Sequence, residues 1–199
     1  MKNFVYLHGF NSAASPNSEK VKMLKTLGNV YTPTYDSFAA YDEILDNLQK
    51  DVSDIDSPIF VGTSLGAYWA MVLSESWYAP AVLINPLLRP VEWFWPRIGQ
   101  DYVNYKTGRY QTVTVECARS YAGAGLLSFL DDSHFRPLIL LDERDEVLNS
   151  AKTLESLGEL DDDAYFMIHS FAGGNHRFAH MKQALNSIEE YTNLCELSV

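Results

Sequence analysis

The serine of the segment Gly62-Thr63-Ser64-Leu65-Gly66 has the sequence context of a catalytic nucleophile. The segment matches the pattern G-x-S-x-G, which places a serine on a sharp turn from a strand into a helix. An apolar run at residues 58–61 precedes it, and a helix-length stretch at residues 65–77 follows it. The start of such a helix offers free N–H groups to an oxyanion. We therefore expect Ser64 to attack an acyl carbonyl.

A serine hydroxyl needs a base to take its proton, usually a histidine that a carboxylate orients. In proteins with this kind of turn, the carboxylate follows the serine in the chain and the histidine comes last. His176 fits because it follows the Gly-rich loop at residues 171–175, between the last expected strand and the last expected helix. We expect His176 to be the base. The other histidines are His8 after the first strand, His134 at the end of an insertion, His169 within a strand and His180 within the last helix.

Two aspartates compete to orient that histidine. Asp142 comes directly after the buried run at residues 138–141, where it could cap the turn. Asp145 lies three residues further into the loop and has more reach toward the histidine loop. We favour Asp145 and keep Asp142 as the alternative, and we interpret Glu143 and Glu146 as solvated.

The loop after the first strand and a long insertion complete the candidate site. The loop His8-Gly9-Phe10 can aim the N–H of Phe10 at an oxyanion beside the N–H of Leu65. The insertion, residues 87–135, is longer than one crossover helix needs, and such insertions are often lids. Its aromatic residues suit a cap over an apolar substrate pocket, or equally a lid packed permanently on the body. The expected pocket residues are Trp93, Phe94 and Trp95.

Short apolar runs alternate with amphipathic stretches along the whole chain, which predicts a doubly wound α/β sheet with helices on both faces. Continuous apolar runs are typical of strands buried on both faces of a parallel sheet. The expected strands are 3–7, 29–34, 58–61, 80–84, 137–141 and 164–169, and the expected helices are 18–27, 41–52, 65–77, 150–157 and a last one with Phe178, Met181, Leu185 and Ile188 on its core face.

Composition excludes several classes of function. The net charge of −11 argues against partners that want a basic surface, namely nucleic acid and anionic membranes. Two cysteines, Cys117 and Cys195, are too few for a disulfide framework or a zinc site. The sequence shows neither a signal peptide nor an apolar run long enough to span a membrane, which predicts a cytoplasmic location. At 199 residues, we expect a single domain.

Several motifs together resemble the small bacterial YqiA/YcfP-type esterases of the α/β-hydrolase superfamily. The resemblance implies a minimal α/β-hydrolase fold with an inserted cap, a six-stranded, mostly parallel sheet and the local strand order 2-1-3-4-5-6. It also implies acyl ester or thioester hydrolysis, with Ser64, Asp145 and His176 as nucleophile, acid and base. The motifs span almost the whole chain: 6–12, 62–67, Ile84-Asn85-Pro86 with Arg89-Pro90, 145–147 and 174–178.

The sequence thus predicts a serine hydrolase that acts on small acyl esters or thioesters without a metal or cofactor. One alternative is an acyl-CoA thioesterase, for which basic residues near the insertion would have to meet the CoA phosphates. The other is a non-catalytic binding module on a hydrolase scaffold, because a fold does not fix a function. The sequence does not predict an oligomeric state. The basic residues near the insertion are Arg89, Arg97, Lys106 and Arg109.

Overall fold

The computed structural model describes every residue except 106, 124, 126–135, 160–165 and 198–199. Its central feature is a six-stranded sheet with the order β2-β1-β3-β4-β7-β8, in which every neighbouring pair is parallel. This confirms the α/β fold that the sequence pattern predicts and the strand order that the family resemblance implies. The strands of this sheet are β1 (Lys2–Leu7), β2 (Gly28–Tyr31), β3 (Pro58–Thr63), β4 (Ala81–Ile84), β7 (Leu138–Asp142) and β8 (Met167–Phe171).

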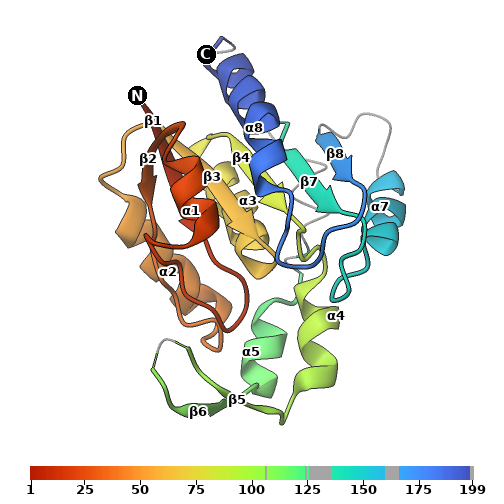
Figure 1. Cartoon of the computed structure of the whole chain (residues 1–199). Coiled ribbons are helices and arrows are strands. Elements are labelled where there is room, and N and C mark those ends of the chain that lie inside the picture. Colours follow the sequence, from red (N-terminus) through yellow and green to blue (C-terminus); the bar gives the residue numbers. More distant parts are fainter. Residues whose placement is uncertain (106, 124, 126–135, 160–165, 198–199) are drawn as a thin grey trace.

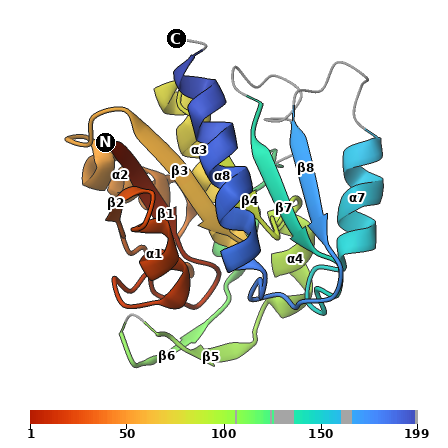
Figure 2. The ribbon, with the colours of Figure 1, turned by 45° about the horizontal axis from the view of Figure 1, so that its top comes forward.

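Helices cover both faces of the sheet (Figures 1 and 2). One face packs against α1 (Glu19–Leu24) and α8 (Met181–Glu196), and the other packs against α2 (Tyr41–Val52), α3 (Leu65–Trp77) and α7 (Ser150–Gly158). Successive strand residues point to opposite faces. The central strands therefore need apolar residues at every position, which explains why β3, β4 and β7 are buried throughout.

The bounds of α2 and α3 are those that the sequence predicts, and other ends differ for local reasons. The first helix is shorter than expected and begins after Ser18, whose hydroxyl accepts a hydrogen bond from the N–H of Val21. The second strand ends at Tyr31, three residues early. The last helix begins after His180, because Phe178 has a φ of 61° that a helix does not accept. The last strand runs to Phe171 and contains His169 as expected; residues 164–165 lie outside the described part.

The described elements between β4 and β7, at residues 90–105 and 107–120, lie beyond the carboxyl ends of the strands, at the bottom of Figures 1 and 2. The strands β5 and β6 form a separate antiparallel hairpin. The described helices are α4, a 3₁₀ turn η1 and α5. The bounds are α4 (Pro90–Phe94), η1 (Trp95–Arg97), β5 (Asp101–Val103), β6 (Tyr110–Thr112) and α5 (Val115–Ser120).

The described part of this segment packs directly into the core. The rings of Phe94 and Tyr121 stack with centroids 5.1 Å apart, and both side chains are fully buried. Tyr121 in turn lies 5.8 Å from the ring of Trp69 in α3. The segment therefore shares the core of the sheet's α3 face, as a packed lid would. His134 lies outside the described residues.

Within the described residues, no helix combines the length and the apolar character that crossing a membrane requires.

Candidate active site

Ser64 occupies the turn between β3 and α3 in a backbone conformation that few non-glycine residues adopt, with φ 58° and ψ −121°. The flanking glycines make this turn possible. A Cβ on Gly62 would lie 1.9 Å from the carbonyl oxygen of Gly66, and a Cβ on Gly66 would lie 2.2 Å from that of Leu7. The turn thus presents Ser64 at the carboxyl edge of the sheet, as the G-x-S-x-G pattern predicts.

Asp145 and His176 meet at the same edge. The Nδ1 atom of His176 lies 2.8 Å from Oδ2 of Asp145 and 3.0 Å from Oδ1. Oδ1 also accepts the N–H groups of Val147 and Leu148, at 2.8 and 2.9 Å. A carboxylate at Nδ1 leaves Nε2 free to accept a proton, which is the arrangement that a histidine base needs.

The surroundings of Asp145 keep it ionised. Burial raises the pKa of its carboxyl, but the hydrogen bond from His176 and the N–H groups of Leu148 and Val147 outweigh that effect, so the pKa lies below its ordinary value. A carboxylate that stays charged at neutral pH can stabilise an imidazolium when the histidine takes up a proton.

Asp142 has different partners from Asp145. It is fully buried, and its Oδ2 accepts the N–H groups of Asn175 and Ala179 at 3.0 and 2.6 Å. Its Oδ1 lies 2.6 Å from Nδ1 of His180. Of the two aspartates, Asp145 therefore contacts His176, and Asp142 holds the loop that carries His176.

The two segments that carry the N–H groups expected at an oxyanion site lie next to Ser64. The loop after β1 passes close by, since a Cβ on Gly9 would lie 3.3 Å from Cβ of Ser64. Leu65 is the first residue of α3, so its N–H has no partner within the helix. Neither Phe10 nor Leu65 donates a backbone hydrogen bond from its N–H group to another described residue. His8, by contrast, is buried and stacks on Tyr35 with ring centroids 4.2 Å apart.

The sequence matches the family model for "Uncharacterised protein family (UPF0227)" from residue 3 to residue 193. The chain belongs to the UPF0227 family. The UPF0227 protein YcfP of Escherichia coli O9:H4 (strain HS) is 26% identical over 198 residues, which cover 96% of this chain and 98% of that protein. A UPF0227 protein of Shewanella sediminis (strain HAW-EB3) is 28% identical over 162 residues, 77% of this chain and 82% of that one. The resemblance to YcfP-type proteins is thereby confirmed.

Solved structures show the same fold in distant proteins. Est1E from Butyrivibrio proteoclasticus superposes with a TM-score of 0.75 at 14% identity, covering 100% of this chain and 89% of that one. Mouse alpha/beta hydrolase domain-containing protein 10 gives 0.67 at 13% identity, with coverage of 97% and 90%. A monoacylglycerol lipase of Paleococcus ferrophilus gives 0.69 at 14% identity, with coverage of 95% and 93%. The UPF0227 chain therefore has the α/β-hydrolase fold.

The three aromatic residues expected to line a substrate pocket have different surroundings in this UPF0227 protein. Phe94 is fully buried in the core, and Trp95 is 53% exposed. Trp93 lies between them in exposure, packs its ring 4.9 Å from that of Phe10 and carries the guanidinium of Arg97 over its other side, 3.9 Å from the ring centroid. Trp93 alone of the three lines the groove described next.

A groove of about 460 Å³ lies between the loop after β4 and helix α7. Its walls touch the candidate catalytic residues from two sides. Leu87 donates its N–H to the carbonyl of Ser64 at 3.2 Å, and Leu148 donates to Asp145. The groove therefore lies next to Ser64 and Asp145. Its lining combines apolar and charged residues: Leu87, Leu88, Trp93, Val147 and Leu148, and Arg89, Glu92, Lys152, Glu155 and Glu159.

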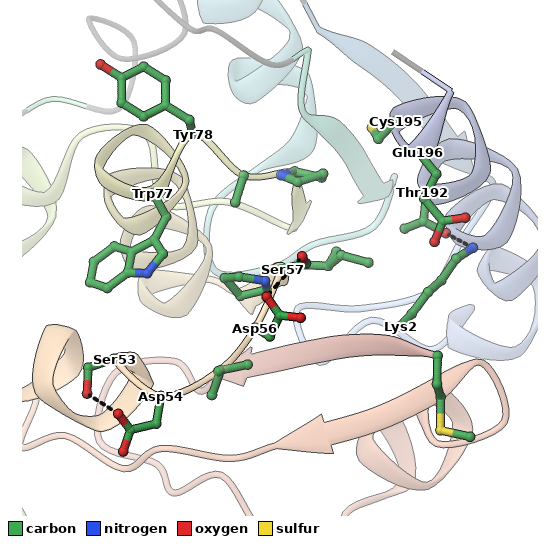
Figure 3. A pocket seen from close by; sticks show the side chains of 16 residues that line it. Lys2, Ser53, Asp54, Asp56, Ser57, Trp77, Tyr78, Thr192, Cys195 and Glu196 are labelled. Carbon is green, nitrogen blue, oxygen red and sulfur yellow. Dashed lines mark hydrogen bonds between the residues drawn. The ribbon is translucent and has the colours of Figure 1, made fainter. Parts of the chain in front are cut away.

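A larger cavity, of about 770 Å³, lies at the opposite edge of the sheet. Figure 3 shows Trp77, Asp56 and Lys2 around it, at the amino ends of the strands. Lys2 is held there by hydrogen bonds from Nζ to Thr192 and Asn193, each 2.6 Å long. Size alone would favour this cavity, but residues that line the smaller groove are hydrogen-bonded to Ser64 and Asp145, so the groove is the candidate substrate site.

Sequence reasoning assigned no role to two residues that contact the histidine loop. Asn85 follows β4 and donates from Nδ2 to the carbonyl oxygens of Asn175 and His176, at 3.1 and 3.2 Å. Glu146, interpreted from sequence as solvated, is exposed, yet it accepts the N–H of His176 at 2.9 Å. The signal for Asn85 was a polar residue directly after a buried strand; Glu146 gave no signal that sets it apart in an acidic loop.

Proposed function

We propose that this protein is a serine hydrolase that cleaves small acyl esters or thioesters through an acyl-enzyme formed on Ser64. The observation that carries the proposal is the Asp145–His176 pair, with a 2.8 Å contact, at the same sheet edge as a serine in a strained strand-to-helix turn. Strained backbone and a buried carboxylate–histidine pair are both costly to maintain, and they are typical of sites where a nucleophile is activated.

In the proposed reaction, His176 takes the proton of the Ser64 hydroxyl while Oγ attacks the carbonyl carbon. The N–H groups of Phe10 and Leu65 stabilise the resulting oxyanion. His176 then gives its proton to the departing alcohol or thiol, which leaves an ester between Ser64 and the acyl group. Water, deprotonated by His176, attacks that ester, and the acid is released with the serine restored.

The groove next to the cluster favours a small substrate. Its volume of about 460 Å³ is in the range of pockets for small ligands. The apolar residues that line it, among them Leu87, Leu88 and Leu148, suit a short acyl chain. We propose that the partner is such a small molecule and that the protein acts in the cytoplasm. The net charge of −11 disfavours nucleic acid and anionic membranes as partners.

Two of the four basic residues that would meet the phosphates of an acyl-CoA substrate already have partners, and a third, Arg109, is exposed on the turn between β5 and β6. Arg89 already pairs with Glu92 at 3.1 Å and with Glu159 at 3.6 Å. Arg97 donates to the carbonyl of Trp93 and stacks on its ring. Lys106 lies outside the described residues. We therefore favour simple esters or thioesters over CoA conjugates.

The test is the Ser64→Ala variant, assayed with short-chain activated esters beside the wild type. We expect hydrolysis to fall by at least about 10⁴-fold, as for loss of the nucleophile in other serine hydrolases, with the melting temperature close to that of the wild type. A folded Ser64→Ala protein with wild-type turnover would exclude the serine mechanism. A wild type that hydrolyses none of the esters would favour the binding-module alternative.

A further inference from the structure

Asn85 connects the strand beside Ser64 to the loop that carries His176. It is 2% exposed, lies directly after β4 and has a positive φ of 41°. Its amide is used on both sides. Oδ1 accepts the N–H of Asp142 at 2.9 Å, and Nδ2 donates to the carbonyls of Asn175 and His176 at 3.1 and 3.2 Å. The peptide of His176 itself is therefore tied to the sheet through this side chain.

The residue before Asn85 also contacts Ser64. Ile84, the residue before Asn85, accepts the N–H of Ser64 with its carbonyl oxygen at 3.0 Å. The carbonyl of Ile84 thus holds the N–H of Ser64, and the side chain of the next residue, Asn85, holds the carbonyl of His176. The separation of these two residues depends on the geometry of Ile84-Asn85.

The separation of Asp145 and His176 depends on other contacts. Asp142 accepts the N–H of Asp145 with its main-chain oxygen at 3.1 Å, and its carboxylate holds the N–H groups of Asn175 and Ala179. A Cβ on Gly174 would collide with that carboxylate, which keeps the loop close to β7. Losing Asn85 should therefore leave the acid–base pair intact and disturb the distance from serine to base.

We expect the rate of catalysis to depend most strongly on the distance from Ser64 to His176. Nδ1 of His176 already contacts Asp145, whereas no hydrogen bond joins Oγ of Ser64 to another residue in the described part of the chain. Catalytic hydrogen bonds are often long in unliganded proteins and tighten when substrate binds. A displacement of about 1 Å in such a contact can cost 10²-fold in rate.

We propose that Asn85 is a positioning residue that sets the distance between Oγ of Ser64 and the ring of His176. The inference rests on the proposed function, because it assigns Asn85 a role in activating that serine. The side chain must be an amide, since only an amide supplies the acceptor for Asp142 and the donors for the histidine loop at once.

Two variants test this role. Asn85→Asp keeps the size, the acceptor for the N–H of Asp142 and the tolerance of positive φ, but it removes both donors. Asn85→Gly removes the side chain without straining the backbone. The matched control is Ser74→Ala, which loses a buried hydrogen bond to the carbonyl of Ala79 at the end of α3, far from the site.

The measurements are the rate and the final extent of labelling by a fluorophosphonate probe, together with kcat and KM for an activated ester. For both Asn85 variants we expect the labelling rate and kcat to fall by about 10²-fold, with KM little changed and labelling still reaching one probe per chain. The control should label at close to the wild-type rate. A merely structural role would instead reduce the fraction of chains that can be labelled and leave the rate of the remainder unchanged.

Wild-type labelling rates in both Asn85 variants would overturn the proposal, and so would a loss confined to the labelled fraction. If the wild type itself is not labelled, the proposed function fails, and amide hydrogen exchange then tests the link separately. The N–H groups of His176 and Arg177 belong to the peptide groups whose carbonyls Asn85 holds, and they should exchange faster in Asn85→Gly than in the wild type. Unchanged exchange would overturn the link between Asn85 and the histidine loop.

Discussion

Two aspartate–histidine pairs lie within a few residues of each other, and they differ in what else the aspartate holds. In both, the carboxylate side chain is buried, at 2% exposed for Asp145 and 0% for Asp142. In both, the contact is to Nδ1 of the ring, at 2.8 Å for His176 and 2.6 Å for His180. The rings are about equally exposed. By the geometry of the pair alone, either could serve as acid and base.

The two pairs differ in the other residues that each contacts. The other contacts of Asp145 go to its own loop, at Val147 and Leu148, so its carboxylate mainly orients a ring. Asp142 holds main-chain N–H groups of the distant histidine loop, and His180 stacks on Phe171 with the ring planes 12° apart. A buried aspartate–histidine pair is thus no sign of catalysis by itself. A catalytic pair also needs a nucleophile that its histidine can reach.

The largest difference should appear between His176→Ala and His180→Ala. Removing the base should lower ester hydrolysis by about 10⁴-fold or more, because the hydroxyl of Ser64 then keeps its proton. Removing His180 should cost far less activity and show mainly as a lower melting temperature. Steady-state kinetics and thermal unfolding of both variants decide this, and equal losses of activity would mean that the two pairs are not distinct in role.

Replacing Asp145 should lower activity more than replacing Asp142, but the difference should be smaller than for the two histidines. Asp145→Asn should cost about 10²- to 10⁴-fold in kcat, because the amide favours the wrong tautomer of His176. Asp142→Asn should cost less than about 10-fold, because its amide oxygen can still accept both N–H groups and its nitrogen can donate to a neutral His180. Both variants are assayed with one activated ester. If Asp142→Asn is the crippled one, the acid has been wrongly assigned.

The smallest effect should appear in acid stability. Since the pKa of Asp145 is lowered in the folded protein, its ionised form stabilises the fold above the ordinary Asp pKa of about 3.9, and this contribution is lost as pH falls through the lowered value. The gap in melting temperature between wild type and Asp145→Asn should therefore shrink below about pH 4. Glu143→Gln, in the same loop but exposed, is the control. A gap that grows with acidification would contradict this sign.

The sequence predicts the sheet and the turn at Ser64 well because both depend on local patterns. Apolar runs predict the buried strands, and two glycines at which a Cβ would collide with backbone oxygens mark the turn. It also favours Asp145 over Asp142 for its reach into the loop, and the contact with His176 agrees with that preference. Whether these residues are catalytic stays a prediction.

The sequence did not predict how the segment after β4 packs, because that depends on contacts between distant residues. Three neighbouring aromatic residues looked alike, yet Phe94 is buried against Tyr121 while Trp95 is half exposed. Asn85 could not be identified for the same reason, since its partners lie about ninety residues away.

The proposed reaction requires Ser64 to be a nucleophile that His176 activates. Treating the wild type with a fluorophosphonate, measuring the intact mass and mapping the modified peptide tests this requirement. We expect one probe per chain on Ser64, no labelling of Ser64→Ala and strongly slowed labelling of His176→Ala. A folded wild type that takes up no probe, or takes it up at another residue, would contradict it.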